Sequence, residues 1–233
     1  MKKLSIVAIF LICTTLFSSV AFAWTVDKVD WDSVEVEVIE NNDVHCETED
    51  NNTPSEWAVE EVIKANEYEI LPQLTGSPRF QDAITREQFA ELVICMLENR
   101  LGGGFELPDT VFSDCTNTQV LKAYAVGVVD GIGNNLFDPK STTNREQIAT
   151  MLYRALNLLE SRLAKDVTPA EADISAFVDC AEVSTWAQDG VGILVANGLM
   201  KGTSQTTLSP KAPCTVEQSI ALVTRIFELV LRR

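Results

Sequence analysis

The chain has a single histidine, His45, and only 18 basic residues against 34 acidic ones, which gives a formal net charge of −16. A surface of this sign repels nucleic acids and anionic membranes, so we expect neither as a partner. The histidine lies beside Cys46 in an acidic stretch, and Cys-x-x-Cys, P-loop and Gly-x-Ser-x-Gly motifs are missing. These absences give little support to a metal, redox or catalytic centre. We therefore expect a protein that is not an enzyme and needs no cofactor or metal.

Long apolar runs are confined to the start of the chain. Lys2 and Lys3 precede an apolar stretch over residues 4–17, and Ala21-Phe22-Ala23 follows it. This order is typical of a secretory signal, which predicts residues 1–23 as a signal peptide and the protein as secreted. Alternatively, the segment stays uncleaved and anchors the chain. No later stretch suits a membrane span, so we expect none after signal removal.

Cysteines are few and odd in number beyond the signal, namely Cys46, Cys95, Cys115, Cys180 and Cys214. At most two disulfides can form among them. Cys115 and Cys180 follow the matched strings Phe-Ser-Asp and Phe-Val-Asp, which places them in equivalent local settings without showing that they touch. The sequence leaves both the pairing and fully reduced thiols open.

Residues 24–53 form an acidic N-terminal arm, with ten acids against Lys28 alone. Val34, Val36 and Val38 alternate with polar residues, which predicts one edge strand. Three aspartates of the arm lack the glycine turn and closing glutamate of an EF-hand loop, so a solvated linker is favoured over a calcium site.

A short motif occurs three times, as Thr85-Arg86-Glu87-Gln88, Asn144-Arg145-Glu146-Gln147 and Thr215-Val216-Glu217-Gln218. Thr or Asn followed three residues later by Gln, and then by an apolar run, is the signature of a capping box at a helix start. We therefore predict helix N-caps and their glutamine partners at Thr85, Asn144, Thr215, Gln88, Gln147 and Gln218.

Shared spacings around these motifs indicate internal repeats. Gly127 and Gly198 each stand 17 residues before the N-cap that follows them, and Gly131 and Gly202 stand 13 before it. Self-similarity at this period predicts helix–loop–helix units that bury their apolar faces against one another. We assign the repeats to residues 54–103, 104–164 and 165–233. In the first repeat one helical face, with Ser55 as a cap, is predicted to hold Trp57, Ala58, Val62, Ile63 and Ala65.

Five strings in these repeats resemble the S-layer homology (SLH) domain: Phe112-Ser113-Asp114, Trp186-Ala187, Gly127-Val128-Val129-Asp130-Gly131, Phe137-Asp138-Pro139 and Thr85-Arg86-Glu87. The first repeat departs from the pattern because it lacks the Gly-x-x-x-Gly and Phe-x-Pro loop. The resemblance implies a mainly α fold of three SLH repeats in a three-pronged, pseudo-threefold assembly. It also implies a protein of the cell wall or S-layer, whose inter-repeat grooves bind secondary cell-wall polysaccharide, often carrying pyruvate ketals.

The arginines of the motif are the leading ligand-binding candidates. Arg86 and Arg145 stand at the first position of a helix, where a cation faces the positive end of the helix dipole. Stability alone does not favour them there, whereas an arginine beside uncapped N–H groups makes a site for a carboxylate. The alternative is a salt bridge to nearby acids such as Glu87 or Glu146. Val216 replaces the third arginine, so we expect at most two competent grooves.

Two tryptophans and two glycines complete the candidate site. Trp57 and Trp186 are candidates for stacking on sugar faces, and the alternative, which is the commoner one for large aromatics at a helix start, is a core position. Gly131 and Gly202 suit tight turns or a positive φ, with close approach of a sugar as the second reading.

Asp130 and Lys201 occupy equivalent loop positions with opposite charge, so the grooves should differ. The functional hypothesis is a non-catalytic polysaccharide-binding protein. The alternative is a protein-interaction module, in which the arm binds a basic envelope protein and the grooves no longer take sugar.

Overall fold

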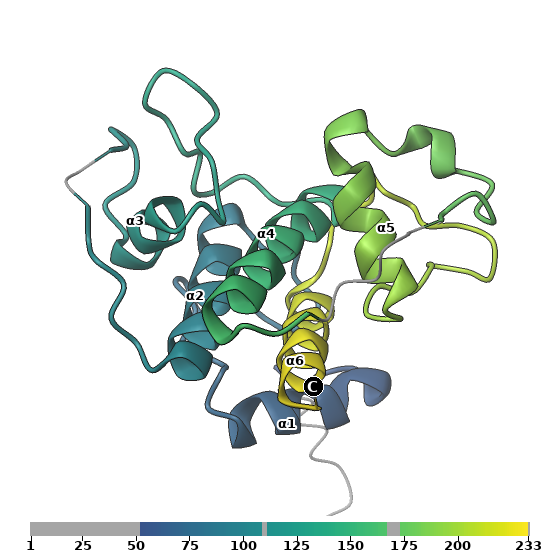
Figure 1. The fold of residues 1–233 in the computed structure, drawn as a ribbon, viewed down its shortest axis with the longest axis horizontal. Coiled ribbons are helices and arrows are strands. Elements are labelled where there is room, and N and C mark those ends of the chain that lie inside the picture. The colour runs from purple at the N-terminus through teal and green to yellow at the C-terminus, as the bar shows by residue number, and fades with distance from the viewer. Residues whose placement is uncertain (1–51, 109–110, 167–172, 233) are drawn as a thin grey trace, which may run out of the picture. The chain divides into compact units, whose positions relative to one another are not determined.

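The computed structural model describes residues 52–108, 111–166 and 173–232 (Figure 1). Its helices are η2 (Glu56–Ala58), α1 (Val59–Glu67), α2 (Arg86–Leu101), α3 (Thr118–Ala125), α4 (Arg145–Leu163), η3 (Cys180–Glu182), η4 (Thr185–Ala187), α5 (Gln188–Ala196) and α6 (Val216–Arg232). These residues contain isolated β-bridges but no strand, so the prediction of a mainly α fold is confirmed. The predicted signal peptide and the predicted edge strand of the arm lie outside the described residues.

The three long helices α2, α4 and α6 begin at the predicted capping boxes. Thr85 accepts a hydrogen bond from the Gln88 amide at 3.3 Å, and the Gln88 side chain accepts one from the Thr85 amide at 3.0 Å. The corresponding distances are 2.9 and 3.0 Å at Asn144 and 3.3 and 3.2 Å at Thr215. Each box satisfies two backbone donors that a helix start would otherwise leave unpaired.

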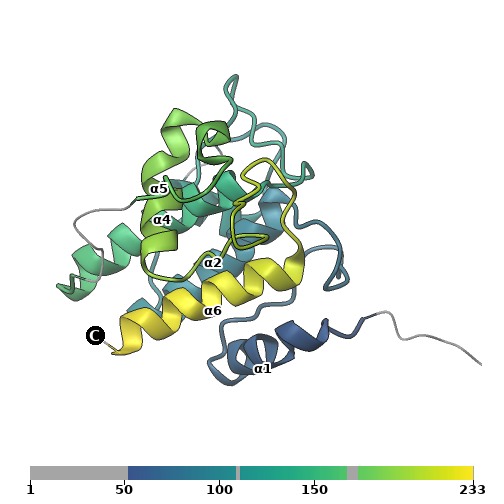
Figure 2. The same cartoon turned by 90° about the vertical axis from the view of Figure 1, so that its right-hand side faces the viewer.

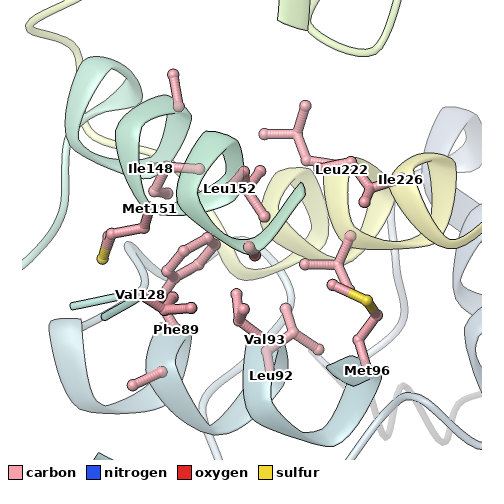
Figure 3. Close-up of a cluster of buried hydrophobic side chains, with 14 of the residues drawn as sticks. Phe89, Leu92, Val93, Met96, Val128, Ile148, Met151, Leu152, Leu222 and Ile226 are labelled. Carbon is pink, nitrogen blue, oxygen red and sulfur yellow. The ribbon is translucent and has the colours of Figure 1, made fainter. Parts of the chain in front are cut away.

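The core lies where the long helices meet. Figure 3 shows side chains of α2, α4 and α6 pointing toward one another, with Phe89, Leu152 and Ile226 among them. All three of these residues are fully buried. The prediction that the units bury their apolar faces against one another is therefore confirmed, and burial of these large side chains is the main stabilising contribution of the fold.

Each short helix packs against a long helix other than the one that follows it in the chain. α3 contacts α2, α5 contacts α4, and α1 contacts α6, so the first short helix lies beside the last long one (Figures 1 and 2). A short helix and the long helix that follows it in the chain are therefore not a self-contained hairpin. The amphipathic face of each short helix is buried only when the whole set assembles.

The residues that precede the three N-caps form a closed ring of backbone hydrogen bonds. Ile84 donates to Cys214 at 2.9 Å, Cys214 donates to Thr143 at 3.0 Å, and Thr143 donates to Ile84 at 3.0 Å. Because the three residues are 59 or more positions apart in pairs, the ring fixes the starts of all three long helices relative to one another.

Glutamates at the second position of the long helices hold the starts of the short ones. Glu146 accepts from the backbone and hydroxyl of Ser184 at 2.9 and 3.0 Å, and Glu217 holds Ser55 in the same way, at 2.9 Å for both bonds. In α2 this glutamate is Glu87, which accepts a hydrogen bond at 2.8 Å from the side-chain amide of Asn117, the N-cap of α3. Ser55 makes no side-chain cap hydrogen bond, so the prediction that it caps a helix was wrong. Its hydroxyl instead donates to a helix 162 residues away.

Candidate binding grooves

The first candidate groove surrounds Arg86 and has a volume of about 290 Å³. We call it the Arg86 groove. It collects residues from the start of α2, the loop before α4, one face of α4, and η4. Its lining residues are Arg86, Asp130, Gly131, Ile132, Gln147, Thr150, Met151, Arg154 and Trp186.

Arg86 is held by backbone carbonyls of the loop that precedes α4. Its Nε donates to the Phe137 carbonyl at 3.0 Å, and its Nη2 donates to the Asp130 carbonyl at 2.9 Å. The guanidinium also lies over the Phe137 ring, with 4.7 Å between Cζ and the ring centroid. Burial lowers the pKa of Arg86 from its ordinary value, yet an arginine stays cationic at neutral pH. The groove therefore contains a fixed positive charge.

A second arginine stands on the α4 side of this groove. Arg154 Nη1 lies 2.6 Å from the carboxylate of Asp130, in a pair whose side chains are 38% and 66% exposed. Asp130 thus contacts both arginines, Arg86 through its carbonyl and Arg154 through its side chain.

The second candidate groove surrounds Arg145 and has a volume of about 350 Å³. We call it the Arg145 groove. It is built from corresponding parts one step further along the chain, namely the start of α4, the loop before α6, one face of α6, and η2. Its lining residues are Trp57, Arg145, Met200, Lys201, Gly202, Thr203, Gln218, Ala221, Leu222 and Arg225.

Arg145 repeats the geometry of Arg86 but is more deeply buried, with 8% of its surface exposed. Its Nε donates to the Leu208 carbonyl at 2.8 Å, and its Nη2 donates to the Lys201 carbonyl at 2.6 Å. Burial lowers its pKa from the ordinary arginine value. Two charge-assisted hydrogen bonds offset part of the cost of burying the guanidinium.

Arg225 is the second arginine of the Arg145 groove. Its Nε donates to Glu61 of α1 at 2.9 Å, and its Nη1 donates to the Leu199 carbonyl at 3.2 Å. Each groove therefore combines one arginine from a helix start, a second arginine from a helix face, and one tryptophan.

The third equivalent position does not form such a groove. Val216 replaces the first arginine, Cys95 replaces the second, and Gln119 replaces the tryptophan. A cavity of about 180 Å³ next to Val216 is lined mainly by apolar residues. Glu91 of α2 is buried and accepts hydrogen bonds from the backbone and hydroxyl of Thr75, which fixes the loop before α2 onto that helix. The position therefore lacks every cation that the two grooves have.

The predicted surroundings of the two helix-start arginines need correction. The amides of Arg86 and Arg145 donate to the carbonyls of Ser141 and Ala212, so these helix N–H groups are occupied by neighbouring loops. Neither guanidinium forms an ion pair with the described residues. The alternative prediction, a salt bridge from these arginines to Glu87 or Glu146, was therefore also wrong. Glu146, its expected partner, binds Ser184 and Lys211 instead. Any carboxylate bound here would meet side-chain guanidinium groups rather than open helix amides.

The tryptophans lie on the surface rather than in the core. Trp57 is 51% exposed and Trp186 is 57% exposed, so the core alternative was wrong. Ile63 is also exposed, at 51%, although the pattern placed it on the buried face with Trp57. The reason is helix geometry: Ala58, Val62 and Ala65 share the buried face, whereas Ile63 lies about 100° around α1 from Val62 and points away from that face.

The loop glycines are required by packing. Neither Gly131 nor Gly202 has a positive φ, so that part of the prediction was wrong. A Cβ on Gly131 would lie 2.8 Å from both the Leu136 carbonyl oxygen and the Phe112 ring, and one on Gly202 would lie 2.4 Å from the Ser204 carbonyl oxygen. Each loop therefore folds too closely on itself for any side chain at these positions.

Sequence reasoning missed Arg154 and Arg225, although a signal was present. Both stand nine residues after the first residue of a long helix, which places them on the same face of α4 and α6. The same count in α2 reaches Cys95. Applying the offsets of the repeats beyond the capping boxes would have found both arginines.

The part of the chain that the structure describes shows no metal site, disulfide or membrane-spanning helix. No group of His, Cys, Asp and Glu is placed to hold a metal ion there. The four cysteines of that part are free thiols, with Cys115 and Cys214 buried, while Cys46 lies outside it. No helix among the described residues is long and apolar enough to cross a membrane.

Comparison with known proteins matches residues 176–217 to the S-layer homology domain. The chain is 31% identical over 176 residues to an endoglucanase of Bacillus sp. (strain KSM-635), a match that covers 73% of this chain and 18% of the relative. It is 27% identical over 150 residues to the surface-layer 125 kDa protein of Lysinibacillus sphaericus, covering 63% and 12%. Exoglucanase XynX of Acetivibrio thermocellus is 22% identical over 182 residues, covering 76% and 16%. The chain thus spans less than a fifth of each relative.

The family match covers a short part of the chain. The chain carries one S-layer homology domain at residues 176–217, which contains Trp186 and Gly202. A domain of this kind is a binding module and points to association with the cell surface or cell wall. Its relatives include a surface-layer protein, and the two glucanases match over a small part of their length.

Proposed function

We propose that the protein attaches to the cell envelope by binding an acidic cell-wall polysaccharide in the Arg86 and Arg145 grooves. In this proposal residues 54–103, 104–164 and 165–233 are three SLH repeats arranged around a pseudo-threefold axis, and the protein is exported and non-catalytic. Each groove is lined by residues from more than one of these proposed repeats, which supports this arrangement. The ring of hydrogen bonds among Ile84, Thr143 and Cys214 supports it as well.

The single observation that carries the proposal is the pairing of two arginines with an exposed tryptophan in each groove. A saccharide that bears a carboxylate, such as a pyruvate ketal, needs a cation for the acid and a flat apolar surface for the ring. Arg86 with Trp186, and Arg145 with Trp57, provide both within one groove. The overall charge of −16 disfavours indiscriminate binding of polyanions, so recognition must be local.

Two grooves on one rigid body also suit a polymer. A polysaccharide repeats the same acidic unit along its length, so one chain or two neighbouring chains can occupy both grooves. The second contact then forms at a high effective concentration, which raises the overall affinity without new chemistry. We therefore propose that both grooves contribute to attachment in the wall.

The proposal is tested by co-sedimentation with purified cell-wall sacculi. We expect the protein to sediment with intact sacculi and to remain in the supernatant after the polysaccharide has been chemically removed. The double variant Trp57→Ala/Trp186→Ala should lose at least tenfold in affinity, because each substitution removes a stacking surface. Both side chains are more than half exposed, so the fold should be preserved.

Ile63→Ala is the matched control for this test. Ile63 is 51% exposed, as Trp57 is, and lines neither groove. The control should sediment like the unmodified protein, and circular dichroism should show equal helicity for all variants. Equal sedimentation with intact and extracted sacculi would contradict polysaccharide binding and would favour a protein partner in the envelope.

A further inference from the structure

The two grooves differ in the side chain at one loop position, whose backbone carbonyl accepts a hydrogen bond from the helix-start arginine in both grooves. The carbonyl of Asp130 accepts from Arg86 at 2.9 Å, and the carbonyl of Lys201 accepts from Arg145 at 2.6 Å. Their side chains therefore start from equivalent places in the two grooves, and both residues line their groove. The side chains carry opposite charges, so the local charge of the two grooves differs by two units at this position.

In the Arg86 groove the loop carboxylate already occupies the second arginine. Asp130 lies 2.6 Å from Arg154, and its side chain is 66% exposed. An exposed ion pair of this kind is weak, so another carboxylate can replace Asp130 at modest cost. The displaced Asp130 would nevertheless remain on the groove wall and repel the incoming acid.

In the Arg145 groove the acid that pairs with the second arginine comes from another direction. Glu61 belongs to α1, its side chain is 16% exposed, and it does not line the groove. The equivalent position in α5 is Gly190, where a Cβ would lie 3.0 Å from the Ala149 carbonyl oxygen and leaves no room for an acid. Arg225 and Lys201 both line this groove, and no carboxylate of the groove lining pairs with Arg225, so its groove face is left for a ligand.

From this difference we infer that Asp130 competes with the saccharide carboxylate for Arg154, and that the Arg145 groove is the tighter of the two binding sites. The inference rests on the proposed function and assigns the two grooves unequal parts in it. Asp130 acts as a specificity-determining residue that weakens the Arg86 groove for anions, and Lys201 strengthens the Arg145 groove. At ligand concentrations too low to fill both grooves, the Arg145 groove is therefore occupied to the greater extent.

The experiment uses the tryptophan that each groove contains. The indole N–H signals of Trp186 and Trp57 are followed by NMR while the full chain is titrated with a methyl glucoside carrying a pyruvate ketal. Trp→Phe variants at the two positions assign the signals. We expect the Kd reported by Trp57 to be about three- to tenfold lower than the Kd reported by Trp186, as one or two solvent-exposed charge contacts would give.

Substitution of the loop residues gives the decisive comparison. Asp130→Asn should lower the Kd reported by Trp186 about two- to fivefold and leave that of Trp57 unchanged. Lys201→Ala should raise only the Kd reported by Trp57. Asp82→Asn is the control, because it makes the same change in net charge at another exposed Arg–Asp pair, Arg79–Asp82, which lines neither groove.

Two outcomes overturn the inference in distinguishable ways. If both indole signals shift with equal Kd values, or if Asp130→Asn leaves the Trp186 value unchanged, Asp130 is not a competitor and the proposed function still stands. If neither signal shifts during the titration, acidic saccharide binding fails and the inference fails with it. Unchanged amide spectra of the variants confirm that the fold is intact.

Discussion

At the scale of single residues, the helix-start arginines combine a structural role with a binding role. Each guanidinium donates to two carbonyls of the next loop, and Arg145 is almost fully buried while doing so. Removing Arg145 would leave those carbonyls without their charged donor and would cost about 1.5–3 kcal/mol of stability. Loss of binding in an Arg145 variant would therefore mix a damaged loop with a lost contact, which is why the exposed tryptophans give the cleaner test.

The aspartate of the Phe-Ser-Asp string provides a prediction about acid stability. Asp114 accepts from the amides of Phe137 and Asp138 at 2.8 Å each, and the Phe137 amide is the main cause that holds its pKa below the ordinary aspartate value. A carboxylate whose pKa is lowered by folding contributes stability that is present above its unfolded pKa and is lost as pH falls through the folded pKa. We therefore expect the urea concentration at the midpoint of unfolding to decrease once the pH falls below about 4, which is close to the ordinary pKa of aspartate.

The variant Asp114→Asn isolates this contribution. Asparagine keeps an acceptor oxygen but has no negative charge at any pH. The urea midpoint of the variant should therefore be lower than that of the unmodified protein at pH 7. It should also change less between pH 5 and pH 3. Asp173→Asn is the matched control, because Asp173 also has a lowered pKa but, among the described residues, it accepts hydrogen bonds from Ser175 of its own turn and not from a distant loop. Parallel acid curves for Asp114→Asn and the unmodified protein would contradict the assignment.

At the scale of elements, the long helices begin where local and tertiary interactions agree. The capping boxes satisfy the third amide of each helix and the amide of the N-cap itself. The first two amides of α4 donate to the carbonyls of Ala212 and Pro210, which belong to the loop before α6. A helix start is thus completed by the following segment of the chain, and this contact also shapes the groove beside it.

Loss of a cap should be measurable as a loss of stability. Asn144→Ala removes the side-chain acceptor of the Gln147 amide, and we expect a decrease of about 1 kcal/mol in the free energy of unfolding in urea. Thr142→Ala, two residues earlier and exposed, should change it by less than about 0.5 kcal/mol. Equal losses in both variants would mean that the capping box contributes no more than any other residue of the loop.

At the scale of the whole described body, closure between its two ends is the main structural feature. α1 packs on α6, and Glu217 holds Ser55 across 162 residues of sequence. Contacts of such long range form only after most of the chain has collapsed, so they couple the short and long helices into one folding unit. The grooves depend on this closure, since the Arg145 groove takes Trp57 from one end and Arg225 from the other.

Native-state hydrogen exchange tests this coupling. Ser55→Ala removes the hydroxyl bond to Glu217, and we expect the most protected amides of α2, α4 and α6 to lose the same amount of protection, equivalent to about 1 kcal/mol. Thr116→Ala, at an exposed loop position whose hydroxyl makes no hydrogen bond to the described residues, should leave protection unchanged. Loss confined to α1 and α6 would show that these helices unfold separately from the rest.

Much of the fold was predictable because its signals are short-range. A capping box needs only four residues, and an apolar face such as Phe89, Leu92, Val93 and Met96 needs only the period of a helix. The glycine and aromatic spacings likewise indicated repeats and the resemblance to the S-layer homology domain. The candidate site was predictable in part, since Arg86, Arg145, Trp57 and Trp186 all line the two grooves.

The sequence by itself determined the helix starts, the buried faces of the long helices and the presence of an arginine at two of the three helix starts. These properties depend on interactions within a few residues or on which side chain stands at a repeated position. Only the tertiary structure decided that helix amides are occupied by neighbouring loops, that Arg154 and Arg225 join the grooves, and that Asp130 and Glu61 reach them from different sides. Those outcomes depend on contacts between segments distant in sequence, which no local pattern specifies.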